Sequence, residues 1–460
     1  MQTEAFDAIV IGAGQAGPAL AARCSKEGLR TAVIERGHFG GTCVNVGCVP
    51  TKTLVASARA IHLARRGAEF GFSTGDIRVD MARVKARKDE QVMHSRQGVE
   101  RWLRGLANCE VLVGEARFVA PATLQVGDRR LTAPRIFVNV GGRAVRPELP
   151  GVHEVPTLDN ASVMELTEAP EHLVIVGGSY IGLEFAQMMR RFGAQVTVVE
   201  KSPRLLPRED DDVADGIRAV LEAEGVRIVL GAECLSLARD GDRIRVGADC
   251  DADAPAIVGS HVLLAVGRRP NTDGLGLDAA GIATDERGYI TVDGQCRSTS
   301  ADGVWAVGDC NGRGAFTHTA YNDHEIVVAN LFDGDPRRID DRIACYALFI
   351  DPPLGRIGQG ERALRDSGRR LLIGRMPMTR VGRAREAGET QGFMKVLVDA
   401  DSRQLLGAAL LGHHADEVVH ALLDLMSAGQ PVDVIARTMH IHPTVSELVP
   451  TLLQQLEPLQ

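Results

Sequence analysis

The sequence lacks any apolar run near the roughly 18 residues that a membrane-spanning helix needs. Its first residues enter an apolar segment directly, without the basic and then apolar leader that directs secretion. Positive charge is also not in excess, because the net charge is −8. We therefore expect a cytoplasmic protein that has neither a nucleic-acid partner nor a membrane partner.

A structural zinc site also has little support. Such a site needs four closed ligands, and no second Cys/His pair of suitable spacing follows Cys43 and Cys48. The other cysteines are scattered at positions 24, 109, 234, 250, 296, 310 and 345. Without a secretory leader, a disulfide is usually catalytic or redox-sensing. We expect no metal, and we interpret Cys43 and Cys48 as a redox pair.

The spacing of this pair fits that interpretation. Four residues separate Cys43 from Cys48, so the two thiols can close a small disulfide at the start of a helix. Lys52 lies four residues after Cys48 and shares its helical face. A dithiol that cycles needs a source of two electrons, which the rest of the chain is expected to supply.

Two glycine-rich segments repeat one pattern. Each follows an apolar strand-like stretch and opens a helix-like stretch, and the glycines are Gly12, Gly14 and Gly17, then Gly177, Gly178 and Gly182. Glu35 lies 23 positions after Gly12, and Glu200 lies 23 positions after Gly177. This arrangement places a pyrophosphate on a helix N-terminus and a ribose hydroxyl on the carboxylate. Two such units predict two dinucleotide cofactors.

The second unit bears on the choice of nicotinamide cofactor. Ser179 replaces the middle glycine, and its small side chain is compatible with a nearby pyrophosphate. Glu200 favours NADH, because a carboxylate repels the 2′-phosphate of NADPH. Lys201 and Arg204 follow directly and offer charges that would instead attract this phosphate. NADH is therefore favoured, and NADPH stays an alternative.

The remaining segments predict further elements. Residues 301–309 form a buried strand that ends at Asp309, an acid suited to a sugar-like chain. After Pro352 and Pro353, strands are expected at 392–399 and 404–411 and a helix at 415–428. The basic stretch 83–104 is mixed with acids and predicts a solvated helix face rather than a binding patch.

Taken together, these motifs resemble the class I pyridine nucleotide–disulfide oxidoreductases, which include glutathione, lipoamide and mercuric enzymes. The motifs are the glycines at 12–17, the redox segment 41–52, residues 114–116, the glycines at 177–182, the pair 308–309 and the segment 442–447. The resemblance implies an α/β fold with two Rossmann-like domains, for FAD and NAD(P), and a C-terminal α+β dimerisation domain. The implied boundaries are 1–145 for FAD, 146–270 for NAD(P), 271–340 completing the FAD-binding fold, and 341–460 for the interface.

The resemblance also implies roles for the site residues. Cys48 would be the charge-transfer thiol against the flavin, and Cys43 the interchange thiol that meets substrate. Lys52 and Glu184 would form an ion pair beside the flavin and nicotinamide. Tyr180 would be the ring that moves aside for the nicotinamide.

The C-terminal motif implies a proton relay. His442, oriented by Glu447, would serve Cys43 of the other subunit, so that homodimerisation is a catalytic requirement. Asp309 would hold the flavin ribityl chain. The cofactor-binding residues implied by the resemblance are Gly12, Gly14, Gly17, Glu35, Gly41, Thr42, Lys52, Ala116, Gly142, Gly267, Asp309 and Thr317, with Gly177, Gly178, Tyr180, Gly182 and Glu200.

The resemblance implies that the acceptor is a disulfide, an oxidised thiol or a small oxidant, and that the reaction contributes to redox homeostasis. Mercuric reductases carry a C-terminal cysteine pair, whereas no cysteine follows Cys345 here. The segment 202–212 looks most like that of the reactive-chlorine-responsive flavoenzymes. Lipoamide dehydrogenase, glutathione reductase and mercuric reductase activities stay alternatives, and so does a flavin-binding redox sensor without turnover.

Overall fold

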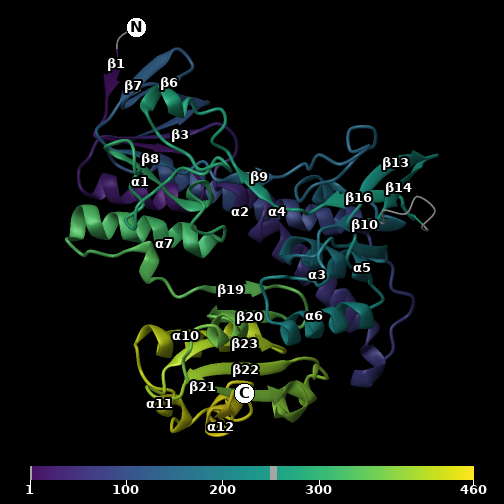
Figure 1. Ribbon diagram of the computed structural model, residues 1–460. Helices are drawn as coiled ribbons and strands as arrows, with labels where there is room; N and C mark the ends of the chain where they lie inside the picture. Colours follow the sequence, from purple (N-terminus) through teal and green to yellow (C-terminus); the bar gives the residue numbers. More distant parts are fainter. Residues whose placement is uncertain (1–2, 249–255, 460) are drawn as a thin grey trace. The chain divides into compact units, whose positions relative to one another are not determined.

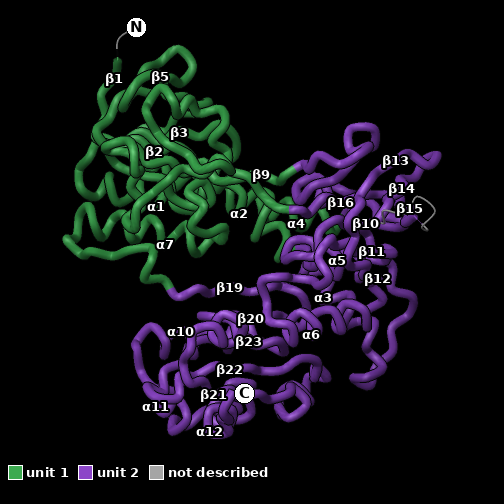
Figure 2. Tube along the Cα trace, viewed as in Figure 1, with its two compact units in different colours: residues 1–53, 83–145, 267–342 green, residues 54–82, 146–266, 343–460 purple. Residues whose placement is uncertain are grey.

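The computed structural model describes residues 3–248 and 256–459, and its internal contacts divide the chain into two compact units (Figures 1 and 2). The first unit comprises residues 1–53, 83–145 and 267–342. The second comprises residues 54–82, 146–266 and 343–460. Residues 267–342 thus cluster with the N-terminal segments, while the four boundaries expected from the sequence stay a prediction.

A five-stranded parallel sheet forms the centre of the first unit, in the order β18-β8-β2-β3-β4. Its strands are β2 (Ala8–Ile11), β3 (Thr31–Glu35), β4 (Cys109–Val113), β8 (Ile136–Val138) and β18 (Val304–Ala306). All four residues of β2 are buried, as expected for a parallel strand covered on both faces. Helix α1 (Ala16–Lys26) connects β2 to β3 and contacts α7 (Thr317–Val328).

The other elements of the first unit surround this sheet. A smaller sheet contains β1 (Thr3–Ala5), β5 (Ala116–Ala120), β6 (Thr123–Val126) and β7 (Arg129–Thr132), and β9 (Gly142–Ala144) pairs with β17 (Arg268–Pro270). The helices are α2 (Gly41–Val46), the start of α3 (Cys48–Arg65) and α4 (Met81–Arg104), with short turns η3 (Leu277–Ala280), η4 (Gly308–Asn311), η5 (Ala329–Asp333) and η6 (Ile339–Asp341).

Helix α4 contains the basic stretch. Most of its basic side chains are exposed or half-buried, as expected for a solvated face. Lys88 differs, because it is buried and forms an ion pair of 2.5 Å with Asp89. The expectation was therefore wrong at this one position, where the helix buries a charge that it compensates locally.

The second unit contains a parallel sheet of four strands in the order β12-β11-β10-β16. These strands are β10 (His172–Val176), β11 (Gln195–Val199), β12 (Arg227–Val229) and β16 (His261–Leu264). The helices are α5 (Tyr180–Phe192) and α6 (Asp211–Ala223), with η1 (Gly67–Phe70) and η2 (Ser162–Glu165), and an antiparallel sheet adds β13 (Ser236–Asp240), β14 (Arg243–Gly247) and β15 (Ile257–Gly259).

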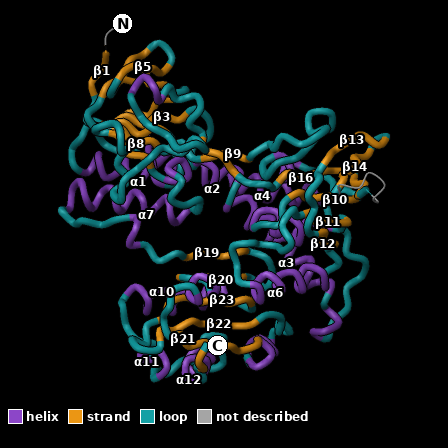
Figure 3. The backbone as a smooth tube through the Cα atoms, in the orientation of Figure 1, coloured by secondary structure: helices purple, strands orange, loops and turns teal. Residues whose placement is uncertain are grey.

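The C-terminal part of this unit is a six-stranded antiparallel sheet (Figure 3). Its order is β19 (Cys345–Leu348), β20 (Leu354–Gly358), β23 (Leu405–Leu411), β22 (Phe393–Asp399), β21 (Leu371–Pro377) and β24 (Glu457–Pro458). The helices are α8 (Glu361–Arg365), α9 (Gly382–Glu386), α10 (Ala415–Ser427), α11 (Asp433–Ala436) and α12 (Leu448–Gln454), with η7 (Met378–Arg380). The predicted strands 392–399 and 404–411 and helix 415–428 are confirmed as β22, β23 and α10.

The two parallel sheets and the C-terminal sheet confirm the expected α/β class with two Rossmann-like units. Each unit repeats the same strand, glycine turn and helix, first as β2 and α1 and then as β10 and α5. Across the described parts of the chain, no helix combines the length and apolar character that crossing a membrane requires.

Candidate functional site

The two glycine turns are built alike. Gly12 and Gly177 both have positive φ, +103° and +117°, and a Cβ there would overlap a backbone carbonyl of a neighbouring strand end. A Cβ at Gly17 would overlap the carbonyl of Gly12, and one at Gly182 that of Gly177. These four glycines are therefore required by the close packing of strand, turn and helix.

The middle position of the first turn differs. A Cβ at Gly14 would have the Asn139 side-chain nitrogen, 3.4 Å away, as its nearest neighbour, which is ordinary contact distance. The protein itself thus leaves room for a Cβ at Gly14. The equivalent residue in the second turn is Ser179, which is exposed in extended backbone just before α5. The backbone at both positions can therefore be approached closely, which fits a bound pyrophosphate.

Each turn is held by the carboxylate that the sequence singled out. Glu35 accepts hydrogen bonds from the backbone nitrogens of Ala13 and Gly37, both at 2.8 Å. Glu200 accepts equivalent bonds from Gly178 at 2.7 Å and Ser202 at 2.9 Å. An ionised carboxylate has about four acceptor positions, so each retains acceptor capacity for a ribose hydroxyl.

Cys43 and Cys48 lie on two consecutive helices of the first unit. Cys43 is in α2, Gly47 separates the two helices, and Cys48 is the first residue of α3. Both are free thiols, with Cys43 half-buried and Cys48 exposed. A Cβ at Gly47 would lie 2.8 Å from the carbonyl oxygen of Thr42, so this short connection has no space for a side chain. The predicted position of the pair at a helix start is observed.

The surroundings of the two thiols distinguish them. A hydrogen bond from Cys43, the Thr317 hydroxyl 3.1 Å away and the charge of Lys52 lower the pKa of Cys48 to about 6, although partial burial opposes this. The same hydrogen bond and burial raise the pKa of Cys43. Cys48 is therefore the thiolate at neutral pH, and Cys43 keeps its proton and donates it.

Thr42 and Asp309, two other predicted cofactor residues of the first unit, lie close to Gly142 and its backbone carbonyl. The Thr42 hydroxyl lies 3.5 Å from it and an Arg268 nitrogen 2.5 Å. Arg268 also forms an ion pair of 3.5 Å with Asp309, whose pKa burial raises. Ala116 is buried at the start of β5, and Gly267 directly precedes Arg268 at a φ of +132°. Gly41, at a φ of +60°, touches the turn, since its Cβ would lie 2.7 Å from the Cα of Gly14.

Two residues of this region were missed by sequence reasoning. Arg268 contacts Thr42, Gly142 and Asp309. The only sequence feature that could have indicated this residue is its position directly after Gly267, at the end of an apolar stretch. Asp323 is buried and accepts hydrogen bonds from the backbone of Gly308 and the side chain of Asn311, which fixes the turn that carries Asp309. Nothing in the local sequence marks Asp323.

Tyr180 and Glu184, two predicted residues of the second unit, lie in the first two turns of α5. Tyr180 is the first residue of α5, and Glu184 is buried one turn later and accepts a hydrogen bond of 3.0 Å from the backbone of Phe349. Lys52 belongs to the first unit and Glu184 to the second, so their ion pair stays a prediction.

The C-terminal motif brings His442 and Glu447 together. His442 Nδ1 lies 2.8 Å from a carboxylate oxygen of Glu447, and the imidazole is 80% exposed. An ionised carboxylate only accepts, so Nδ1 carries the proton and Nε2 faces solvent. Nearby Met439 and Ile441 are 95% and 80% exposed, an unusual exposure for apolar side chains.

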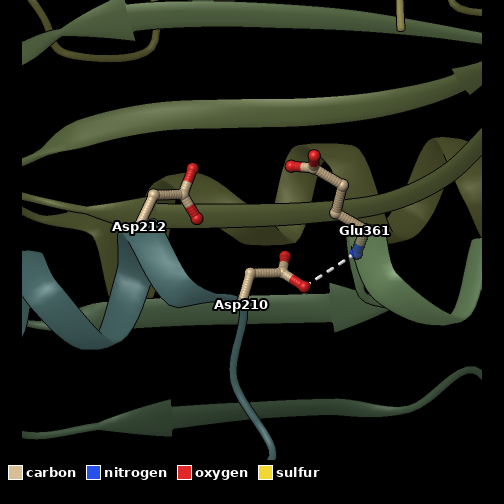
Figure 4. Close-up of side chains that lie close together, drawn as sticks. All are labelled: Asp210, Asp212 and Glu361. Carbon is tan, nitrogen blue, oxygen red and sulfur yellow. Dashed lines mark hydrogen bonds between the residues drawn. The ribbon is translucent and has the colours of Figure 1, made fainter. Parts of the chain in front are cut away.

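A cluster of three carboxylates in the second unit, Asp210, Asp212 and Glu361, has the geometry of a cation site (Figure 4). The ammonium of Lys395 lies among them, 2.9 Å from Asp210, 2.6 Å from Asp212 and 3.3 Å from Glu361. The lysine is buried and supplies the positive charge, so the cluster is an ion-pair network.

Of the cysteines, Cys250 lies outside the described residues.

Comparison with known proteins assigns two successive segments of the chain to one protein family. The family model described as pyridine nucleotide-disulphide oxidoreductase matches residues 6–323, and the dimerisation domain of that family matches residues 345–453. The probable pyridine nucleotide-disulfide oxidoreductase RclA of Escherichia coli is 35% identical over 450 residues, covering 96% of this chain and 97% of the relative. A dihydrolipoyl dehydrogenase of Chlorobaculum tepidum is 33% identical over 452 residues, covering 96% and 95%.

A solved structure agrees with these relatives. It is described as the Cu(II) complex of the HOCl-induced flavoprotein disulfide reductase RclA from Escherichia coli. It superimposes with a TM-score of 0.90 at 34% identity and covers 99% of both chains. The similarity therefore extends over the whole described chain and not over the nucleotide-binding units alone.

The difference between Gly14 and Gly17 generates a first prediction. Gly14→Val is expected to fold but to bind no flavin, because only the approach of a pyrophosphate requires the missing side chain. Gly17→Val is expected not to fold, because its Cβ overlaps the carbonyl of Gly12. Circular dichroism, the melting temperature and the flavin absorbance per chain measure both. A folded Gly14→Val protein with one flavin per chain would contradict the prediction.

The Thr317 contact generates a second prediction. In a Cys43→Ser background, which keeps a hydroxyl donor, the alkylation rate of Cys48 by iodoacetamide should titrate near pH 6 and fall below it as the thiolate is protonated. Thr317→Val removes a donor to the thiolate and should move the midpoint upward by about one pH unit. Thr317→Ser, which retains the hydroxyl, is the matched control. Equal midpoints in the valine and serine variants would show that Thr317 does not stabilise the thiolate.

Proposed function

The chain belongs to the pyridine nucleotide-disulfide oxidoreductase family, and from this premise we propose how its own residues perform the reaction. It is an enzyme that uses FAD and a pyridine nucleotide, and its dimerisation domain indicates a homodimer. The flavin supplies two-electron transfer between the nicotinamide and the Cys43–Cys48 disulfide. We propose the division 1–145, 146–270, 271–340 and 341–460 for the corresponding domains.

Cys48 is the thiol that faces the flavin, and Cys43 is the thiol that exchanges with the acceptor. The opposite pKa shifts of the two groups carry this proposal. A thiolate is the form that donates electron density, so Cys48 suits the flavin side. The proton on Cys43 must leave before this thiol attacks an acceptor, which requires a base.

The cofactor residues follow the two turns. Gly12, Gly14, Gly17 and Glu35 hold the adenine dinucleotide of FAD, and the other flavin contacts are Gly41, Thr42, Lys52, Ala116, Gly142, Gly267, Asp309 and Thr317. Gly177, Gly178, Tyr180, Gly182 and Glu200 hold the nicotinamide dinucleotide. The proposed Lys52–Glu184 ion pair joins the two sets beside the reacting rings.

NADH is the favoured nucleotide. Arg204, which would recruit a 2′-phosphate, forms an ion pair with Asp211. The Glu200 carboxylate is fixed by two backbone nitrogens at the place where that phosphate would lie. Lys201 is exposed and would be the remaining cation for NADPH.

The base for Cys43 is the partner subunit's His442. Its Nδ1 is bound to Glu447, which leaves Nε2 for proton exchange. The exposed apolar side chains of Met439 and Ile441 beside it fit a surface that a second subunit covers. The acceptor is a disulfide, an oxidised thiol or a small oxidant, and the cytoplasmic location stays a prediction.

Turnover separates this enzyme from a redox sensor. With an excess of acceptor, the consumption of NADH should continue for many equivalents per enzyme, because the Cys43–Cys48 disulfide is regenerated in each cycle. A panel of oxidised glutathione, lipoamide, mercuric and cupric ions and hypothiocyanous acid identifies the acceptor by kcat/KM. Cupric ion is included because the similar structure is described as a Cu(II) complex. Consumption that stops after one equivalent with every acceptor would favour the sensor.

His442→Ala should slow turnover of disulfide acceptors by roughly 10²–10⁴-fold, the usual contribution of a positioned acid–base group. Stopped-flow reduction of the flavin by NADH should stay unchanged, because it precedes the step that needs the proton. Glu447→Ala should give a smaller loss of the same kind, since Glu447 only orients the imidazole.

His440→Ala is the matched control, because His440 is a neighbouring imidazole that bonds only a backbone carbonyl among the contacts described. It should turn over disulfides at the rate of the unmodified enzyme. If His442→Ala slowed flavin reduction by NADH as much as turnover of disulfides, His442 would contribute to the dimer interface and not to proton transfer.

A further inference from the structure

The hydroxyl of Tyr180 is bonded to a buried carboxylate that no motif singled out. It donates a hydrogen bond of 2.7 Å to Glu209 Oε1, and the hydroxyl of Tyr346 on β19 donates one of 2.6 Å to the same oxygen. The two rings meet edge to face with centroids 5.6 Å apart. All three residues belong to the second unit.

Glu209 is held in place from its other side. Only 3% of the residue is exposed, and Arg356 Nε lies 3.4 Å from its second oxygen. Arg356 is buried as well and donates to the backbone carbonyls of Ile357 and Ala408. Within the described residues, Glu209 Oε2 accepts no well-aligned hydrogen bond, so the two tyrosines are the principal donors to this carboxylate.

Both tyrosines remain donors at neutral pH. Burial and the nearby negative charge of Glu209 raise the pKa of Tyr180, and they raise that of Tyr346 to about 12. Each hydroxyl therefore keeps its proton and directs it to the carboxylate. Hydrogen bonds to a charged group are about twice as strong as neutral ones.

The segment that carries Glu209 is itself fixed. The next residue, Asp210, accepts a hydrogen bond of 2.8 Å from the backbone of Glu361 (Figure 4). Its carboxylate is also paired with Lys395 at 2.9 Å. Although burial opposes it, the Lys395 ammonium holds the pKa of Asp210 below its usual value. Glu209 consequently has little freedom to follow Tyr180 if the ring moves.

We propose that Glu209 is a positioning residue that anchors the Tyr180 ring, and that binding of the nicotinamide must break this anchor. The inference rests on the proposed function, in which Tyr180 belongs to the nicotinamide site, and on the movement of its ring that the family resemblance implies. Breaking a charge-assisted hydrogen bond to a buried carboxylate opposes that movement. The anchor therefore lowers the affinity for NADH, and it keeps the ring in one position while no nucleotide is bound.

Tyr180→Phe tests the anchor in the flavin-loaded enzyme. It keeps the ring and removes only the hydroxyl, so the dissociation constant for NADH should fall roughly tenfold. The measurement is the concentration dependence of stopped-flow flavin reduction. Glu209→Gln, which weakens the acceptor by removing its charge, should also lower the dissociation constant, by a smaller factor.

Tyr346→Phe is the matched control, because it removes the other donor to the same oxygen but leaves Tyr180 bonded. Its dissociation constant for NADH should stay equal or rise, and it should not fall. In the Tyr180→Phe background, Glu209→Gln should have no further effect on the affinity for NADH, because the hydrogen bond is already absent. A structural contribution of Glu209 would still appear in that background, but only as a lower melting temperature.

The inference is overturned if Tyr180→Phe binds NADH as the unmodified enzyme does, or more weakly. It is also overturned if Glu209→Gln changes NADH affinity equally with and without the Tyr180 hydroxyl. A failure of the proposed function looks different, because the unmodified enzyme would then show no flavin reduction by NADH at any concentration.

Discussion

A cysteine thiol with an ordinary pKa is mostly protonated at neutral pH, and the chemistry of this protein depends on changing that for one thiol of a pair. Cys48 achieves it by position: it begins a helix, has Lys52 on the same helical face and lies 3.1 Å from the Thr317 hydroxyl. Cys43 contributes the proton that stabilises the thiolate and so becomes the weaker acid. The pair is thus divided into two functions before any substrate arrives.

The glycine turns use negative charge in a different way. In both repeats the acid after the second strand accepts two backbone hydrogen bonds, one from the turn itself and one from two residues further along the chain. The carboxylates of Glu35 and Glu200 therefore shape the turns as well as offering acceptors to a ribose. In both copies the acid 23 residues after the first glycine reaches back to the glycine turn that precedes the helix.

Sequence reasoning succeeded where a function is encoded locally. The glycine turns, the strands at 392–399 and 404–411 and the helix at 415–428 follow from spacing and periodicity, and the cysteine pair falls at the predicted helix start. Arg268 and Glu209 were missed because their partners lie far away in sequence: Gly142 is 126 residues from Arg268, and Tyr346 is 137 residues from Glu209. Asp323 was missed although its partners Gly308 and Asn311 are only 15 and 12 residues away, because the local sequence does not show that its side chain turns back to them. A buried polar contact of that kind is decided by tertiary packing, and nothing in either local segment records it.

The segment between β11 and α6 joins these themes. It begins at Glu200, which accepts a hydrogen bond from the second glycine turn. It ends at Glu209, which accepts a hydrogen bond from Tyr180, and at Asp210, which pairs with Lys395. Lys395 belongs to the antiparallel sheet, so the eleven residues 200–210 connect the second glycine turn to the C-terminal sheet within one unit. A buried carboxylate is stable only where a cation pairs with it or hydrogen-bond donors contact it. The polar residues of this segment are therefore matched by partners in the second glycine turn, in Tyr180 and in the C-terminal sheet, and these contacts tie the turn to the sheet.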